Sequence, residues 1–86
     1  MQVIKVTSTS SIFTGHAAVL GITLVPGSAA ATITLDDSTD GSGSDKGGVK
    51  TDSSYSREAS MYGAMFNTGI YATISGAGAV AYVYIK

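Results

Sequence analysis

The sequence predicts an all-β fold, a small antiparallel β-sandwich or jelly-roll-like domain. Its apolar residues are mostly Val, Ile and Ala, with only three leucines, and β-branched residues favour strands. Several short segments alternate apolar and polar residues with the period of two that a half-buried strand requires. Glycine-containing turns separate these segments, and no long segment has a helical period. Together these observations indicate short strands packed in two sheets.

Four strands are expected in the first half of the chain. Residues 3–7 alternate apolar and polar side chains and predict the first strand. A loop over residues 8–11 leads to a short strand at residues 12–13. The strongest strand candidate spans residues 17–25, and the turn signal Pro26-Gly27 ends it.

The fourth strand covers residues 30–36, which alternate cleanly. Ala31, Ile33 and Leu35 share one face, which we expect to be buried. The following residues, 37–54, are rich in Gly, Ser and Asp and include a single apolar residue. We therefore expect a long polar loop there, of the kind that signals either function or disorder.

The second half of the chain predicts three further strands. Residues 55–66 fit both a short helical turn and an alternating strand, and we favour the strand. A turn at residues 67–69 precedes an alternating strand over residues 70–75. A glycine turn at residues 76–78 then leads into the closing strand, residues 79–86.

Length and charge restrict the function further. One domain is expected over residues 1–86, because a chain this short buries only about 60% of its unfolded surface. A deep catalytic cleft is therefore not expected, and oligomerisation would add stability. The net charge of -1 offers no basic surface to nucleic acid or anionic lipid and favours self-association. We expect neither a nucleic acid nor a membrane as partner.

Membrane insertion and export are also not expected. The N-terminus lacks a basic leader followed by a long apolar run, so we expect no secretory signal peptide. The longest apolar stretch, residues 17–25, is shorter than the about 20 residues that a membrane-spanning helix needs.

Two strands are apolar on both faces, residues 17–25 and residues 80–85. A two-layer sandwich buries one face of each strand, so the second face needs a cover. A loop of the chain itself and a neighbouring subunit both satisfy this need. Tyr82 and Tyr84 suit a subunit contact, because tyrosine adds apolar area and keeps a hydroxyl for a polar partner.

Asp36, Ser38 and Asp40 are the only candidates for a metal site. Oxygen ligands at alternate positions, followed by Gly41, match the opening half of a calcium loop. The closing glutamate is missing, because Gly47 stands at its position. We interpret this run as a solvated surface loop and expect no bound metal.

No catalytic motif is present, and we expect the protein not to be an enzyme. The absence of cysteine excludes disulfides, thiolate zinc sites and cysteine nucleophiles. The one histidine, His16, has no partner at a spacing typical of a catalytic triad. The glycines of residues 41–48 match neither the phosphate-binding nor the dinucleotide-binding pattern, so no cofactor is expected.

A family resemblance rests on four runs taken in order: Gly21–Leu24, Ala31–Asp36, Phe66–Ala72, and Ile74–Gly78 leading into Ala81–Tyr84. In this order the chain resembles the small β-sandwich virion structural proteins of tailed phages. That class decorates or cements capsids, or forms head fibres and tail-attached modules. The polar segment over residues 37–54 is longer than the loop expected at this place in that family.

The resemblance implies a non-enzymatic capsid decoration or cement subunit. Such proteins form homo-oligomers, often trimers, and their partner is the major capsid protein or another virion protein. It also implies a place in the virion, which is assembled in the host cytoplasm. On this hypothesis we expect Tyr71, Tyr82 and Tyr84 to be interface residues. The alternative is a carbohydrate- or receptor-binding β-module of a tail or surface fibre, whose tyrosines would stack on sugar rings.

Overall fold

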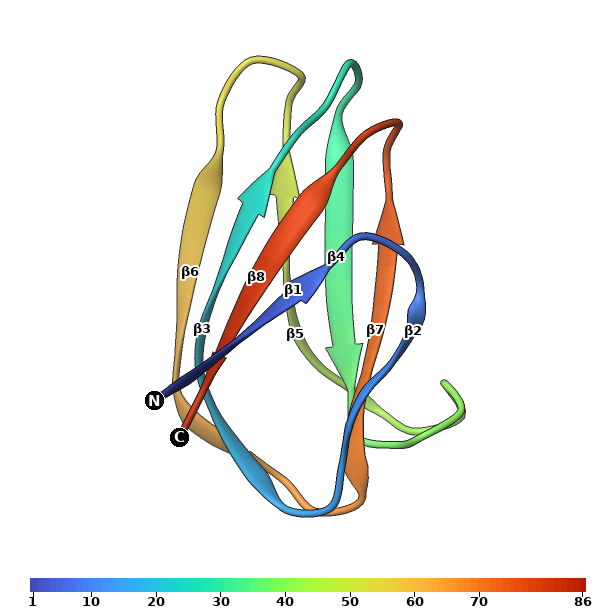
Figure 1. Ribbon diagram of the computed structural model, residues 1–86, viewed down its shortest axis with the longest axis vertical. Coiled ribbons are helices and arrows are strands. Elements are labelled where there is room, and N and C mark those ends of the chain that lie inside the picture. The colour runs from blue at the N-terminus through green and yellow to red at the C-terminus, as the bar shows by residue number, and fades with distance from the viewer.

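The computed structural model describes all residues from 1 to 86 and consists of eight strands joined by turns and loops (Figure 1). The strands are β1 (Gln2–Val6), β2 (Ser10–Thr14), β3 (Ala17–Val25), β4 (Ala31–Asp36), β5 (Asp45–Thr51), β6 (Arg57–Phe66), β7 (Gly69–Ser75) and β8 (Val80–Ile85). No helix is long and apolar enough to span a bilayer.

The strands form two four-stranded antiparallel sheets packed face to face. One sheet has the order β1-β8-β3-β6 and the other the order β2-β7-β4-β5. This is the strand order of a jelly roll, in which the two sheets are joined by repeated crossings of the chain. The predicted fold class, an antiparallel β-sandwich with jelly-roll character, is confirmed. The two termini lie close together, because β1 pairs with β8 (Figure 1).

The core lies between the sheets. It consists of the residues, at about every second position of each strand, whose side chains point toward the other sheet. Ala31, Ile33 and Leu35 are buried as predicted, since their polar neighbours in β4 point to the outer face. The core's largest fully buried side chain is that of Phe66, at the end of β6. Fifteen further apolar residues, from Val6 to Ile85, bring this cluster to 16.

The strand predictions are confirmed for residues 17–25, which match β3, and for residues 70–75 and 79–86, which agree with β7 and β8 within a residue at each end. Residues 55–66 form a strand, as favoured, although it begins at Arg57. The predicted loop over residues 8–11 ends earlier, because β2 begins at Ser10.

The prediction of a polar loop over residues 37–54 is wrong for residues 45–51, which form β5. This strand lies at the edge of its sheet and pairs only with β4, so its outer face needs no apolar side chains. Its inner face buries Val49 and Thr51. Gly48 lacks the Cβ atom that would collide with the backbone of β4. Residues 45–51 have low strand propensity, but they form a strand because they pair with β4.

Candidate functional site

The outer surface of the β1-β8-β3-β6 sheet is the candidate site, and we call it the tyrosine face. In β8, Ala81 and Val83 point into the core and are fully buried, whereas Tyr82 and Tyr84 point outward and are partly exposed. The same alternation in the neighbouring strands places mostly apolar residues beside them. The tyrosine face comprises Val3, Lys5, Leu20, Gly21, Thr23, Val25, Glu58, Ser60, Val80, Tyr82 and Tyr84.

Strand register arranges these side chains in rows, because directly opposed residues of an antiparallel sheet share a face. One row crosses all four strands as Val3, Tyr84, Gly21 and Ser60. The next row is Lys5, Tyr82, Thr23 and Glu58, and a third pair is Val80 with Val25. The two charges thus stand at opposite edges of an apolar and tyrosine-rich centre, three strand spacings or about 14 Å apart.

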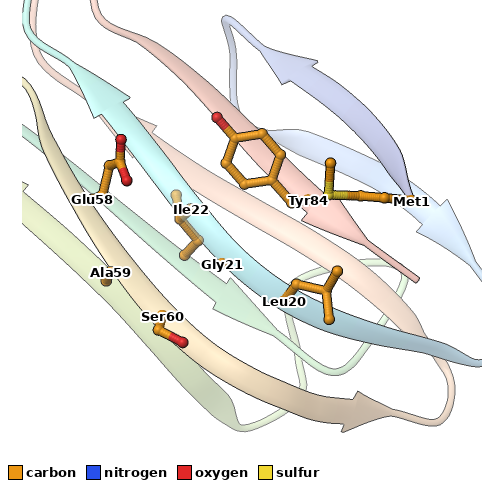
Figure 2. Close-up of a pocket in the computed structure, with 8 residues that line it drawn as sticks. All are labelled: Met1, Leu20, Gly21, Ile22, Glu58, Ala59, Ser60 and Tyr84. Atoms are coloured by element: carbon orange, nitrogen blue, oxygen red, sulfur yellow. The ribbon is translucent and has the colours of Figure 1, made fainter.

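An open groove of about 450 Å³ lies on the tyrosine face, along β3 (Figure 2). Its lining residues are Met1, Leu20, Gly21, Ile22, Glu58, Ala59, Ser60 and Tyr84. Figure 2 shows Tyr84 and Met1 on one side of β3 and Glu58, Ala59 and Ser60 on the other. The groove therefore has an apolar floor and a carboxylate at one end.

Gly21 and Tyr84 shape the groove. Gly21 contributes no side chain, and a Cβ atom there would lie 2.9 Å from the carbonyl oxygen of Ala59, so the two strands approach closely at this point. The hydroxyl of Tyr84 and Oγ1 of Thr23 lie 2.9 Å apart in a hydrogen bond. This bond holds the tyrosine side chain over β3 and fixes one wall of the groove.

A bulge in β6 displays a second tyrosine beside the groove. Val19 opposes Ala64 and Gly21 opposes Ser60, so three residues of β6 face the single residue between them in β3. Tyr62 lies in this bulge with a φ angle of 55°, in the left-handed region that non-glycine residues rarely adopt. Its side chain is 92% exposed. A strained backbone that presents a bare aromatic ring is a typical feature of a binding site.

The three predicted interface tyrosines do not lie together. Tyr82 and Tyr84 share the tyrosine face, whereas Tyr71 belongs to β7 in the other sheet. A Cβ atom at Gly41 would lie 3.0 Å from the Tyr71 ring, so the ring packs against the β4–β5 loop. The chain's own β4–β5 loop therefore covers the Tyr71 side chain.

The three candidate metal ligands belong to two separate sets of hydrogen bonds. Ser38 donates a hydrogen bond from Oγ to the carboxylate of Asp36 and accepts one from the N–H of Gly41. The carboxylate of Asp40 instead accepts hydrogen bonds from the hydroxyl and the N–H of Ser42, and these bonds lower the pKa of Asp40. No group of three or more His, Cys, Asp or Glu side chains is arranged to hold a metal ion.

Asp37 has a structural role that the sequence did not reveal. Its carboxylate accepts hydrogen bonds from the backbone N–H groups of Asn67, Thr68 and Gly69 in the β6–β7 turn. The partners lie in a distant turn, so no local pattern indicates them. The remaining candidate, His16, is exposed in the β2–β3 connection and does not line the groove.

Comparisons of the chain with protein-family models, with curated proteins and with solved structures find no match. The features of the chain that bear on its function are therefore the tyrosine face, its groove and the bulge at Tyr62.

Proposed function

We propose that the chain is a non-enzymatic structural protein of a phage virion, a capsid decoration or cement subunit that self-associates and binds the capsid surface. The observation that carries this proposal is the tyrosine face. It combines an apolar centre, two partly exposed tyrosines and charges confined to the edges. Protein–protein interfaces have this composition, with few charged residues at the centre and a polar rim.

The fold supports a role in a virion by analogy. The strand order of the two sheets is that of a jelly roll, a topology that recurs in viral capsid domains and also in lectins and cupins. Because one fold serves many functions, the site carries more weight than the topology. The groove is open and its only carboxylate is that of Glu58, with no lysine, arginine or histidine beside it, which fits a protein contact better than a reaction centre.

Co-sedimentation with capsids tests the proposal. Capsids of the source phage that lack this chain are mixed with the purified protein and pelleted, and saturable binding is expected. Tyr82→Ser should weaken the binding, because it removes the aromatic ring from the centre of the face through which the subunits self-associate, and a subunit that no longer self-associates loses avidity for the capsid. Tyr55→Ser is the matched control, since Tyr55 is 73% exposed in the β5–β6 connection, outside that face. A chain that never pellets with capsids and is absent from purified virions contradicts the proposal.

Tyr62 favours a second candidate function, a carbohydrate- or receptor-binding module of a tail or surface fibre. An exposed aromatic ring on a strained bulge is suited to stacking on a sugar ring. A glycan array probed with the wild-type chain and with Tyr62→Ala tests this candidate. Binding that disappears in the variant supports it, and an array without any binding eliminates it.

A further inference from the structure

We infer that the tyrosine face is a two-fold contact between two copies of this chain, with the symmetry axis parallel to β3 and β8. The inference rests on the proposed role of this face as a protein contact and names the partner as a second copy. Three relationships on the face lead to it: the positions of its charges, the position of its groove, and the order of its rows.

A two-fold axis parallel to the strands exchanges the two edges of the sheet and keeps positions along the strands. In such a pair, β1 of one copy lies over β6 of the other, and β8 lies over β3. Residues of the same row therefore face each other. The axis makes the contact isologous, so each complementary pair occurs twice.

The charges are complementary in this arrangement. Lys5 belongs to β1 and Glu58 to β6, and both stand in the row that contains Tyr82 and Thr23. Each Lys5 then meets Glu58 of the second copy, giving two ion pairs at the rim. Within one chain the two side chains stand at opposite edges of the sheet, too far apart to pair.

The shapes are complementary in the same arrangement. The groove extends from Tyr84 and Met1 across β3 to β6, and over Gly21 and Ser60 it is open because these residues present little side-chain bulk. The opposite side presents Val3, an apolar side chain that is 50% exposed on β1 and belongs to the same row. Exchange of the edges places Val3 of each copy over the groove of the other. In the third row, Val80 of each copy meets Val25 of the other.

An axis perpendicular to the strands does not give this match. It places β1 over β1 and β6 over β6, so both lysines lie at one edge of the contact, both glutamates lie at the other, and no Lys5–Glu58 pair can form.

Charge reversal tests the inference. Light scattering over a concentration series measures the dimer dissociation constant of the wild type, Lys5→Glu, Glu58→Lys and the double variant. Each single reversal replaces two attractions by two repulsions and should weaken the dimer about tenfold. The double variant recreates both pairs and should return to the wild-type value. An equimolar mixture of the single variants should form heterodimers of wild-type affinity.

Lys50→Glu is the matched control, because Lys50 is an exposed lysine on β5 in the other sheet, and it should leave the dimer unchanged. A monomeric wild type, a trimer, or a double variant no stronger than the single ones overturns the inference. The capsid assay separates this result from the proposed function. A monomer that pellets with capsids refutes the dimer and supports the capsid-binding part of the proposed function, whereas a dimer that ignores capsids supports the inference and refutes capsid binding.

Discussion

The carboxylate of Asp37 lies 2.8 Å from the backbone nitrogen of Thr68 and accepts its hydrogen bond, joining two turns separated by 31 residues of chain. The N–H groups of Asn67 and Gly69 donate to the same carboxylate. Asp37 thereby fastens the β4–β5 loop to the β6–β7 turn at one end of the sandwich. The donated bonds, first that of Asn67 and then that of Thr68, hold the pKa of Asp37 below its usual value of 3.8.

Asp37→Asn should lower the stability of the fold at neutral pH, because the uncharged amide accepts these hydrogen bonds more weakly. The folded pKa lies below the unfolded value of 3.8, so the contribution of Asp37 is fully present above that value and is lost as the pH falls through the folded pKa. Urea unfolding at pH 7 and at successively lower pH should show the gap between wild type and variant closing in acid. Asp45→Asn, an exposed carboxylate without a side-chain hydrogen bond, should show no such gap. A gap that persists in acid would contradict the assignment.

Thr51→Val should stabilise the protein. The Oγ1 atom of Thr51 is buried without a hydrogen-bond partner, on a residue that is 8% exposed. Valine has nearly the same shape and removes the desolvated hydroxyl, so the free energy of unfolding should rise by about 1 kcal/mol. Thr73→Val, at an exposed position of β7, provides the comparison and should change little. Equal or lower stability of Thr51→Val in urea would show that the hydroxyl has a partner in solution.

The alternating strands were predictable because each contains its own burial signal. In β4, Ala31, Ile33 and Leu35 recur at every second position, and this period specifies both the strand and its buried face. In β5 the only apolar residue is Val49, among glycines and charged side chains, so no periodic signal exists. That strand forms because β4 has a free edge with which residues 45–51 can pair. The free edge is a property of the whole sheet, so the sequence of the segment alone does not indicate it.

The candidate site was predictable only in part, for the same reason. The sequence indicates that Tyr82 and Tyr84 share an outward face of one strand. It cannot indicate that Lys5 and Glu58 stand in one row, because the rows depend on which strands are neighbours and in what register. Tyr71 has the same local pattern, yet the topology places it on the opposite sheet.

Thr23 and Tyr84 should be energetically coupled. Their hydroxyl groups form a hydrogen bond of 2.9 Å between β3 and β8, in a partly buried position. A double-mutant cycle with Thr23→Val and Tyr84→Phe should give a coupling energy of about 0.5–1 kcal/mol in urea unfolding. Strictly additive single changes would mean that the bond does not form in solution.

Tyr62 should show a conflict between stability and binding. Its left-handed backbone conformation strains any residue with a Cβ atom, so Tyr62→Gly should raise the free energy of unfolding by about 1 kcal/mol. Tyr62→Ala removes the ring and keeps the strain, so its stability should stay close to that of the wild type.

Both variants should lose any binding that depends on the ring, whether to a glycan or to a capsid. A stabilised Tyr62→Gly with weakened binding would identify Tyr62 as a residue kept for binding at a cost in stability. If both variants bind as the wild type does, the exposed ring serves neither ligand. If Tyr62→Gly is no more stable than Tyr62→Ala, the bulge carries no strain.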